Sequence, residues 1–148
     1  MKKLIVITLF LFQSCLVHAA SYEVKMLDFG NDGGMVFEPG FLKVEPGDTI
    51  TFLPSSTGHF VRSALLPDGH SEWLSKLDEP FTVTLDDAGV YVYYCPPHLT
   101  VAMVGVIQVG EASGKDSVIE EMKSFNRRQL QNKKRLWSYI DQIEWSDE

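Results

Sequence analysis

The sequence predicts a mainly β fold, in which a two-sheet sandwich over residues 20–110 is followed by a helical tail over residues 111–148. Residues 21–110 are rich in β-branched and aromatic residues and are broken at short intervals by Gly, Pro, Asp and Asn. That pattern is typical of many short strands joined by turns, which favours a sandwich. The tail has neither Pro nor Gly from Lys115 onward and is rich in Glu, Lys, Arg and Gln. This composition predicts helix.

The N-terminus has the pattern of a secretory signal peptide over residues 1–19. Lys2 and Lys3 precede a short apolar run, and the small residue Ala19 ends the segment at a suitable cleavage site. The run is shorter than the roughly 20 apolar residues that a membrane helix needs. Cys15 raises the alternative of a lipoprotein anchor, but residues 12–14, Phe-Gln-Ser, are a poor context for lipid attachment. We expect a mature protein that is soluble and outside the cytoplasm.

The strands of the sandwich are predicted from two kinds of pattern. Residues 49–52 and 81–85 alternate between apolar and polar side chains, which indicates strands with one buried face. Residues 89–94 and 104–109 are apolar almost throughout and predict strands buried on both faces. Residues 45–48 and 67–69 supply Pro, Gly and Asp for turns.

The tail carries an apolar stripe at helical spacing, which predicts one amphipathic face. Its members are Val118, Met122, Phe125, Leu136, Ile140 and Ile143. Packing on the sandwich is favoured over a partner-binding helix, because such stripes are usually core. Ser117 and Glu120 have the spacing of a capping box at the helix start. The pattern leaves open whether the tail bends near Asn126 or Asn132.

Charge and cysteine content narrow the functional classes. Loss of Lys2 and Lys3 with the signal peptide changes the formal net charge from −7 to −9, so nucleic acid and anionic membranes are not expected as partners. The mature 129 residues suffice for one domain. Cys95 is then the only cysteine, and an unpaired thiol in an oxidising compartment predicts that something occupies its sulfur.

Potential metal ligands are concentrated in the segment from Cys95 to Met103, with His98 between them. A thiolate, an imidazole and a weak thioether donor match a type 1 copper site, which requires one more imidazole. His59, which lies 36 residues before Cys95 and follows Gly58, is the best candidate. Each residue alone has a structural explanation, as a buried core side chain or a hydrogen-bonded histidine. His70 is interpreted as a solvated turn residue, and Met26 and Met35 as packing residues.

Residues 22–110 resemble the pseudoazurins, bacterial members of the blue copper cupredoxins. The shared motifs are GGMVFEP at 33–39, PGDTITF at 46–52, GH at 58–59, LPDG at 66–69, GVY at 89–91, CPPH at 95–98 and MVGVIQVG at 103–110. The resemblance implies a cupredoxin-type Greek-key sandwich with one type 1 copper held by His59, Cys95, His98 and Met103. It also implies a periplasmic carrier that shuttles single electrons between redox partner proteins, commonly reductases of denitrification. A monomer is expected.

The sequence departs from that family at positions near the copper. Phe60 stands where the family usually has an Asn that ties the two ligand loops, and the backbone N–H of Phe60 is expected to donate to the Cys95 sulfur instead. Pro96 follows the cysteine where Thr is more common, and it has no N–H. Family lysines around the copper are replaced, for example by Thr57 and Tyr94. We therefore expect an apolar contact face around His98, formed by Pro96, Pro97, Leu99, Val101 and Ala102.

Other functional classes are less well supported. Four protein ligands leave no open position for a substrate, so catalysis is not expected. The same ligands suit a copper-handling protein that stores or delivers the metal, and the altered surroundings of the ligands favour that alternative. A third reading is a zinc-binding or metal-free interaction module, but the ligand softness and the affinity order favour copper.

Overall fold

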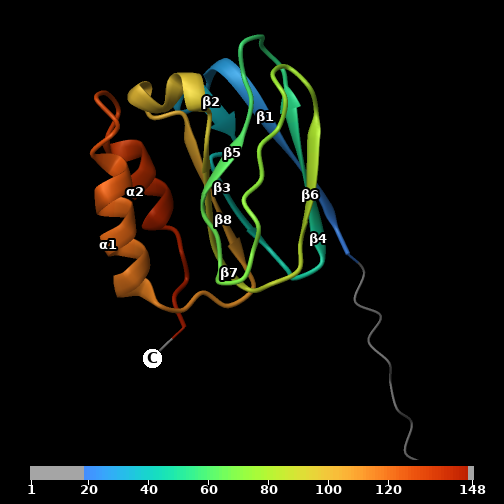
Figure 1. Cartoon of the computed structure of the whole chain (residues 1–148), viewed down its shortest axis with the longest axis vertical. Helices are drawn as coiled ribbons and strands as arrows, with labels where there is room; N and C mark the ends of the chain where they lie inside the picture. The colour runs from blue at the N-terminus through green and yellow to red at the C-terminus, as the bar shows by residue number, and fades with distance from the viewer. Residues whose placement is uncertain (1–18, 147–148) are drawn as a thin grey trace, which may run out of the picture.

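The computed structural model describes residues 19–146 and shows a two-sheet sandwich with helices on one side (Figure 1). The first sheet has the order β2-β1-β4-β6, and the second has the order β3-β8-β7-β5. The mainly β prediction is confirmed. The strands are β1 (Ser21–Gly30), β2 (Gly33–Glu38), β3 (Phe41–Val44), β4 (Asp48–Pro54), β5 (Arg62–Leu65), β6 (Phe81–Leu85), β7 (Gly89–Tyr94) and β8 (Val104–Val109).

The predicted signal peptide lies outside the described residues except for its last position, so it stays a prediction. Among residues 19–146, no helix has the length and apolar character that crossing a membrane requires.

The core between the two sheets follows from the period-2 alternation of the strands. In β4, Ile50 and Phe52 are completely buried, whereas Thr49 and Thr51 point to the other face, where the Thr51 hydroxyl lies 3.0 Å from the hydroxyl of Thr82 on β6. The same core cluster contains Cys95 and Met103. The interior of the sandwich therefore continues directly to the residues that the sequence predicts as ligands.

β7 and β8 are buried on both faces, as predicted, because each face meets a different layer. Along β7, Tyr91 and Tyr93 belong to the core between the sheets, whereas Val92 and Tyr94 belong to a second cluster under the helices. The two strands pair antiparallel along their whole length, from Gly89 opposite Val109 to Tyr94 opposite Val104. The chain between their ends is short, which places Cys95 and Met103 close together.

The tail forms two helices, α1 (Lys115–Asn126) and α2 (Lys134–Ile140), that cover the second sheet. The buried residues of the apolar stripe, Met122, Phe125, Leu136, Ile140 and Ile143, share the second cluster with residues of β7 and β8. The helices are separated by residues 127–133, where Asn132 has a φ of 51°. Of the two positions at which a bend was considered, Asn126 is the last residue of α1 and Asn132 lies within this linker.

The predicted capping box at Ser117 is wrong. Helix α1 begins two residues earlier, at Lys115, and Gly114 is its N-cap with a φ of 69° and no side-chain capping bond. Gly adopts this left-handed conformation without the cost that a side chain brings. Ser117 therefore lies inside the first turn, where its spacing to Glu120 has no capping role.

Arg135 of α2 joins the tail to the end of the sandwich that carries Cys95. Its guanidinium is buried and donates to four backbone carbonyl oxygens at 2.8–3.0 Å. Three of them, at Asp32, Gly34 and Met35, lie at or next to the turn between β1 and β2, and the fourth is at Ala102 just before Met103. One side chain thus fixes the position of α2, the β1–β2 hairpin and the chain entering β8.

Candidate metal centre

Cys95, His98 and Met103 lie on a compact connection between β7 and β8. The 3₁₀ helix η1 (Pro96–Val101) occupies most of it, and its first residues are prolines, whose missing N–H groups cost nothing at a helix start. The backbone N–H of Cys95 donates to the carbonyl of Met103 at 3.0 Å, and that of Met103 to the carbonyl of His98 at 3.1 Å. These bonds close the connection on itself and hold the backbones of Cys95, His98 and Met103 close together.

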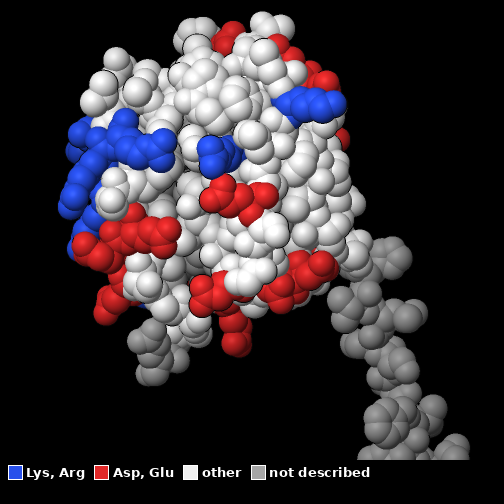
Figure 2. Space-filling model, viewed as in Figure 1, with Lys and Arg blue, Asp and Glu red and all other residues white. Residues whose placement is uncertain are grey.

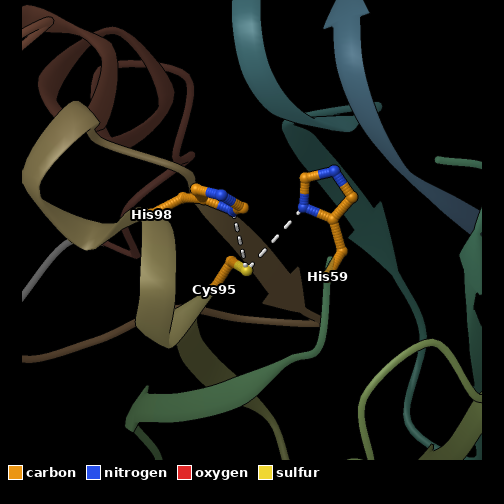
Figure 3. Close-up of side chains that lie close together, drawn as sticks. All are labelled: His59, Cys95 and His98. Atoms are coloured by element: carbon orange, nitrogen blue, oxygen red, sulfur yellow. Dashed lines mark hydrogen bonds between the residues drawn. The ribbon is translucent and has the colours of Figure 1, made fainter. Parts of the chain in front are cut away.

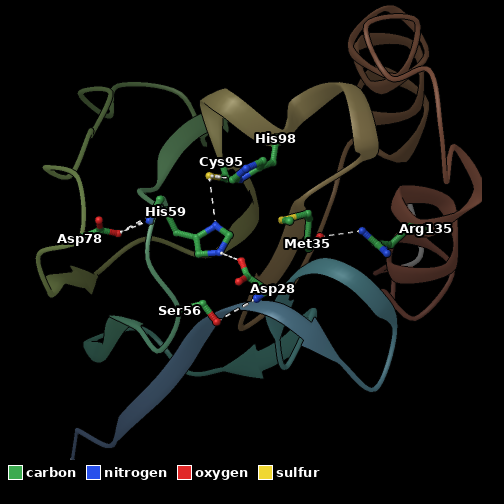
Figure 4. Close-up of polar contacts among 9 residues, drawn as sticks. Asp28, Met35, Ser56, His59, Asp78, Cys95, His98 and Arg135 are labelled. Carbon is green, nitrogen blue, oxygen red and sulfur yellow. Dashed lines mark hydrogen bonds and ion pairs between the residues drawn. The ribbon is translucent and has the colours of Figure 1, made fainter.

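His59 reaches the same point from the loop between β4 and β5. Its ring is completely buried, and the carboxylate of Asp78 accepts the backbone N–H groups of Gly58 and His59 at 2.7 and 3.0 Å. On the ring, Nε2 lies 2.9 Å from Oδ1 of Asp28 on β1 (Figure 4). Both the backbone and the ring of His59 are therefore fixed by carboxylates.

The donor atoms of Cys95, His98 and His59 converge (Figure 3). The Cys95 Sγ atom lies 3.4 Å from Nδ1 of His98 and 3.9 Å from Nδ1 of His59. One donor atom of each residue lies within 4.8 Å of the others. Met103 is completely buried. It belongs to the same core cluster as Cys95 and as Val61, which lies two residues after His59. A thiolate and two imidazoles beside a thioether are the donor set that type 1 copper uses, so the residues present fit that ion.

Burial sets the protonation of the donors in the metal-free protein. Burial raises the pKa of the Cys95 thiol, and backbone N–H groups of Phe60 and His98 directed at the sulfur partly offset this effect. Burial, followed by the nearby His59, lowers the pKa of His98 below its ordinary 6.5. At neutral pH the site therefore presents a neutral His98 and a protonated thiol, and a metal ion displaces the thiol proton when it binds.

The contact of Phe60 with the sulfur follows the expectation from sequence, since its backbone N–H and not its side chain is the group involved. Asp78 ties the His59 loop to the segment at 76–79, because its carboxylate accepts the N–H groups of Gly58 and His59. Asp78 in turn donates its own N–H to the carbonyl of His59 at 2.9 Å.

The expected apolar contact face is only partly correct. Leu99 is 6% exposed and Ala102 is completely buried, so neither contributes to the surface around His98. Ala102 turns inward because it adopts a left-handed conformation with a φ of 62° at the end of η1. Pro97 and Thr100 are exposed, and Pro96, His98 and Val101 are partly exposed.

The remaining histidine and methionines lie outside the cluster. His70 is not freely solvated, because its Nε2 pairs with Asp87 at 2.7 Å and its side chain is only 26% exposed. Met26 is completely buried in the core, as expected. Met35 packs against that core, and Figure 4 shows it between the cluster and Arg135.

Sequence reasoning missed Asp28 and Asp78. Asp28 lies near the end of a strand pattern and Asp78 lies in an irregular segment, so neither stands in a motif with the ligands. The only available signal was chemical, because a buried metal-binding imidazole generally needs a partner for its second nitrogen.

Comparison with known proteins agrees with this geometry. Residues 24–110 match a family model described as copper binding proteins, plastocyanin/azurin family. A putative pseudoazurin of Rhizobium leguminosarum bv. viciae is 50% identical over 95 residues, which are 63% of this chain and 62% of the relative. The pseudoazurin of Paracoccus pantotrophus is 45% identical over 96 residues, 64% of this chain and 66% of the relative. The matched stretch thus spans slightly less than two thirds of these two relatives.

A longer match and two solved structures extend the likeness into the tail. The pseudoazurin of Methylorubrum extorquens is 36% identical over 128 residues, 85% of this chain and 84% of the relative. The crystal structure of native pseudoazurin from Hyphomicrobium denitrificans superposes with a TM-score of 0.73 at 31% identity, over 84% of this chain and 98% of that chain. A pseudoazurin from Sinorhizobium meliloti gives 0.70 at 33% identity, over 84% and 97%.

Proposed function

The chain belongs to the plastocyanin/azurin family of copper-binding proteins, and from this premise we propose that it is a type 1 copper electron carrier with the ligands His59, Cys95, His98 and Met103. The observation that carries the proposal is the convergence of one sulfur and two imidazole nitrogens within 4.8 Å. Met103 is completely buried in the same core cluster as Cys95. Soft sulfur donors select copper, and a weak axial thioether distinguishes this set from structural zinc sites.

The residues of the chain supply a rigid and dry environment for one-electron transfer. Bound copper would provide the Cu(II)/Cu(I) couple. His59, Cys95 and Met103 are completely buried, so water does not reach these three side chains. Hydrogen bonds of Asp28 and of the backbone hold these donors in place, and a site that is fixed in this way needs little rearrangement when its charge changes. Because all four positions are protein ligands, no place is left for a substrate, and we infer a carrier and not an enzyme.

His98 is the ligand at which electrons enter and leave. Of the four proposed ligands it alone is partly exposed, and it lies on η1 with Pro97 and Thr100 exposed beside it. Electron-transfer complexes are small and transient, so a limited surface around this histidine is sufficient for docking.

We further propose that the redox partner presents an acidic surface, because a basic segment of the tail lies beside η1. The linker between α1 and α2 is bonded to η1: the N–H groups of Leu130 and Gln131 donate to the carbonyl of Thr100 at 2.7 and 3.0 Å. The Asn132 side chain donates to the carbonyl of Val101 at 3.2 Å. Figure 1 shows this linker at the same end of the molecule as η1.

The charge of this segment differs from that of the rest of the chain. Residues 122–140 contain no Asp or Glu, although the whole chain carries a formal net charge of −7. Arg127, Arg128, Lys133 and Lys134 are all exposed, and Leu130 among them is 72% exposed. Figure 2 shows basic residues gathered over the α1–α2 end. A basic rim with an exposed apolar residue suits an acidic protein surface.

The predicted signal peptide supports a periplasmic location, and the resemblance to pseudoazurins favours reductases of denitrification as electron acceptors. Copper storage or delivery is the alternative use of the same ligands. The complete burial of Cys95 and His59 favours retention of the metal over its release.

The copper site is tested by visible and EPR spectra of the mature protein loaded with Cu(II), beside its Cys95→Ser variant. We expect an intense thiolate-to-copper absorption in the wild type that is absent from the variant. A colourless wild-type protein would refute the electron-carrier proposal. Rapid loss of copper to a chelator during repeated redox cycles would favour the copper-handling alternative.

The basic surface is tested with two small redox probes of opposite charge, hexacyanoferrate and hexaammineruthenium. The double variant Arg127→Glu/Lys133→Glu is compared with Lys25→Glu/Lys115→Glu, which makes the same change of net charge at exposed residues outside the linker. We expect the linker variant alone to slow electron transfer with the anion and speed it with the cation, most strongly at low salt. Equal effects of both double variants would refute a docking role for the linker.

A further inference from the structure

We propose that Asp28 is a positioning residue for the copper site, which fixes His59 in its metal-binding tautomer and lowers the reduction potential of the bound copper. This inference rests on the proposed function, because it assigns His59 as a copper ligand. It concerns a carboxylate that no motif of the sequence connects with the ligands.

The sheet topology places Asp28 against His59. The parallel ladder between β1 and β4 ends at Met26 opposite Pro54, so β1 continues beyond its partner. The chain after β4 then turns across this overhang, where the N–H groups of Ser55 and Ser56 donate to the carbonyl of Met26 at 3.0 and 3.1 Å. The N–H of Asp28 donates to the Ser56 hydroxyl at 3.1 Å. Asp28 is thus anchored to the segment that leads to His59.

The contact with the ring determines where the imidazole carries its proton. Oδ1 of Asp28 lies 2.9 Å from Nε2 of His59. A carboxylate only accepts hydrogen bonds, so Nε2 must be the protonated nitrogen of the neutral ring. The lone pair then remains on Nδ1, the nitrogen that faces the Cys95 sulfur at 3.9 Å. The tautomer required for metal binding is therefore already selected in the metal-free protein.

The charge of Asp28 has a separate effect, because a carboxylate bonded to a ligand imidazole increases electron donation to the metal. The His59 side chain is completely buried, whereas that of Asp28 is 48% exposed, so water screens the charge only from the outer side. Within residues 19–146, no Lys or Arg lies within ion-pair distance of Asp28. Its negative charge is therefore available to favour Cu(II) over Cu(I), which lowers the potential.

Two substitutions separate the effects of the acceptor and of the charge. Asp28→Asn keeps an oxygen acceptor for the Nε2 proton but removes the charge. Asp28→Ala removes both. Glu23→Gln is the matched control, because it removes the same charge from an exposed position on the same strand, five residues away. Circular dichroism checks that each variant is folded.

The potential of the copper-loaded variants tests the charge. We expect Asp28→Asn to keep the blue absorption and to lower the Cu(II)/Cu(I) affinity ratio about tenfold, which is a rise of about 59 mV for one electron. Glu23→Gln is expected to leave the potential within a small fraction of that shift. Equal potentials for Asp28→Asn and Glu23→Gln would overturn the role of the charge, whereas a wild type without blue absorption would instead refute the proposed function.

Nitrogen-15 NMR of the metal-free protein tests the tautomer without any copper. We expect wild type and Asp28→Asn to show His59 with a protonated Nε2 and a free Nδ1. Asp28→Ala should show a mixture of tautomers, because nothing else among the contacts of Nε2 selects between them. If Asp28→Ala retains the wild-type tautomer, the positioning role is overturned.

Discussion

The two loops that carry the proposed copper ligands are stabilised in opposite ways. The loop of His59 is held by side chains, with Asp78 on its backbone and Asp28 on the ring, and the histidine is completely buried. The connection from Cys95 to Met103 is held mainly by its own backbone bonds and from outside by Arg135, and its His98 is partly exposed. One loop belongs to the interior and the other to the surface.

This difference suggests a division of roles between the two histidines. A ligand that is enclosed and bonded through its second nitrogen sets the geometry and potential of the metal, because neither water nor a partner reaches it. A ligand on a compact surface turn lies where a redox partner can make contact. The following predictions test this division, beginning with the largest expected effect.

Removal of each histidine gives the strongest contrast. We expect His59→Gly and His98→Gly both to lose the blue absorption, and added imidazole to restore it only in His98→Gly. The space left by His98 opens to solvent, whereas that left by His59 is enclosed by protein. Absorption spectra during imidazole titration provide the measurement, and rescue of both variants would show that the two sides are equally accessible.

The surface loop depends on the tail through Arg135. Arg135→Met leaves four carbonyl oxygens without their charged donor, so we expect it to lower the free energy of unfolding by about 3 kcal/mol. Arg128→Met is the control, because Arg128 is exposed and only lies over the rings of Tyr94 and Phe125 at 5.6 Å. Urea denaturation measures both, and similar losses would contradict a special role of Arg135.

Proton release distinguishes Cys95 from His98 during metal binding. The pKa of Cys95 is raised by burial, so its thiol proton competes with the metal throughout the neutral range, and affinity rises with pH. The pKa of His98 is lowered below 6.5, so its proton competes only in acid. We expect Cys95 to contribute about a tenfold gain in Cu(II) affinity per pH unit between pH 7 and 8. Chelator competition should show that Cys95→Ser loses this contribution. If the Cu(II) affinity of the variant rises with pH as steeply as that of the wild type, the thiol of the wild type is already ionised before the metal binds.

The smallest effect concerns the backbone of the His59 loop. Asp78→Ala removes the acceptor for two N–H groups at an exposed position, and we expect a loss of stability of about 1 kcal/mol with the blue absorption retained. The ring of His59 remains fixed by Asp28. Thermal unfolding and the absorption spectrum check the two parts, and loss of the absorption would show that Asp78 also holds the ligand.

The fold was predictable to the extent that it depends on local pattern. The alternation of residues 49–52 and 81–85 and the uninterrupted apolar runs at 89–94 and 104–109 follow directly from one or two buried faces. Cys95, His98 and His59 were also predictable as neighbours, because their donor types and spacing suit one ion. That Met103 completes the ligand set stays a prediction.

The rest depends on contacts between distant residues that no local pattern records. Asp28 meets His59 only because β1 extends past β4, and Arg135 meets Ala102 only after α2 has docked. The inward turn of Ala102 depends on its left-handed backbone, whereas the sequence shows only a small apolar residue in a loop. The α1 start was misplaced because Gly114 caps the helix by conformation and the capping pattern assumes a side chain.

The acid-free segment at 122–140 has a consequence for the motion of the whole molecule. Positive groups gather on the side that α1 and α2 cover, while the chain as a whole is negative, so the protein has an electric dipole as well as a net charge. In the field of an acidic surface, such a dipole experiences a torque that rotates the molecule before the two surfaces touch. Random collisions therefore become more often productive, since the rotational search that normally limits association is shortened.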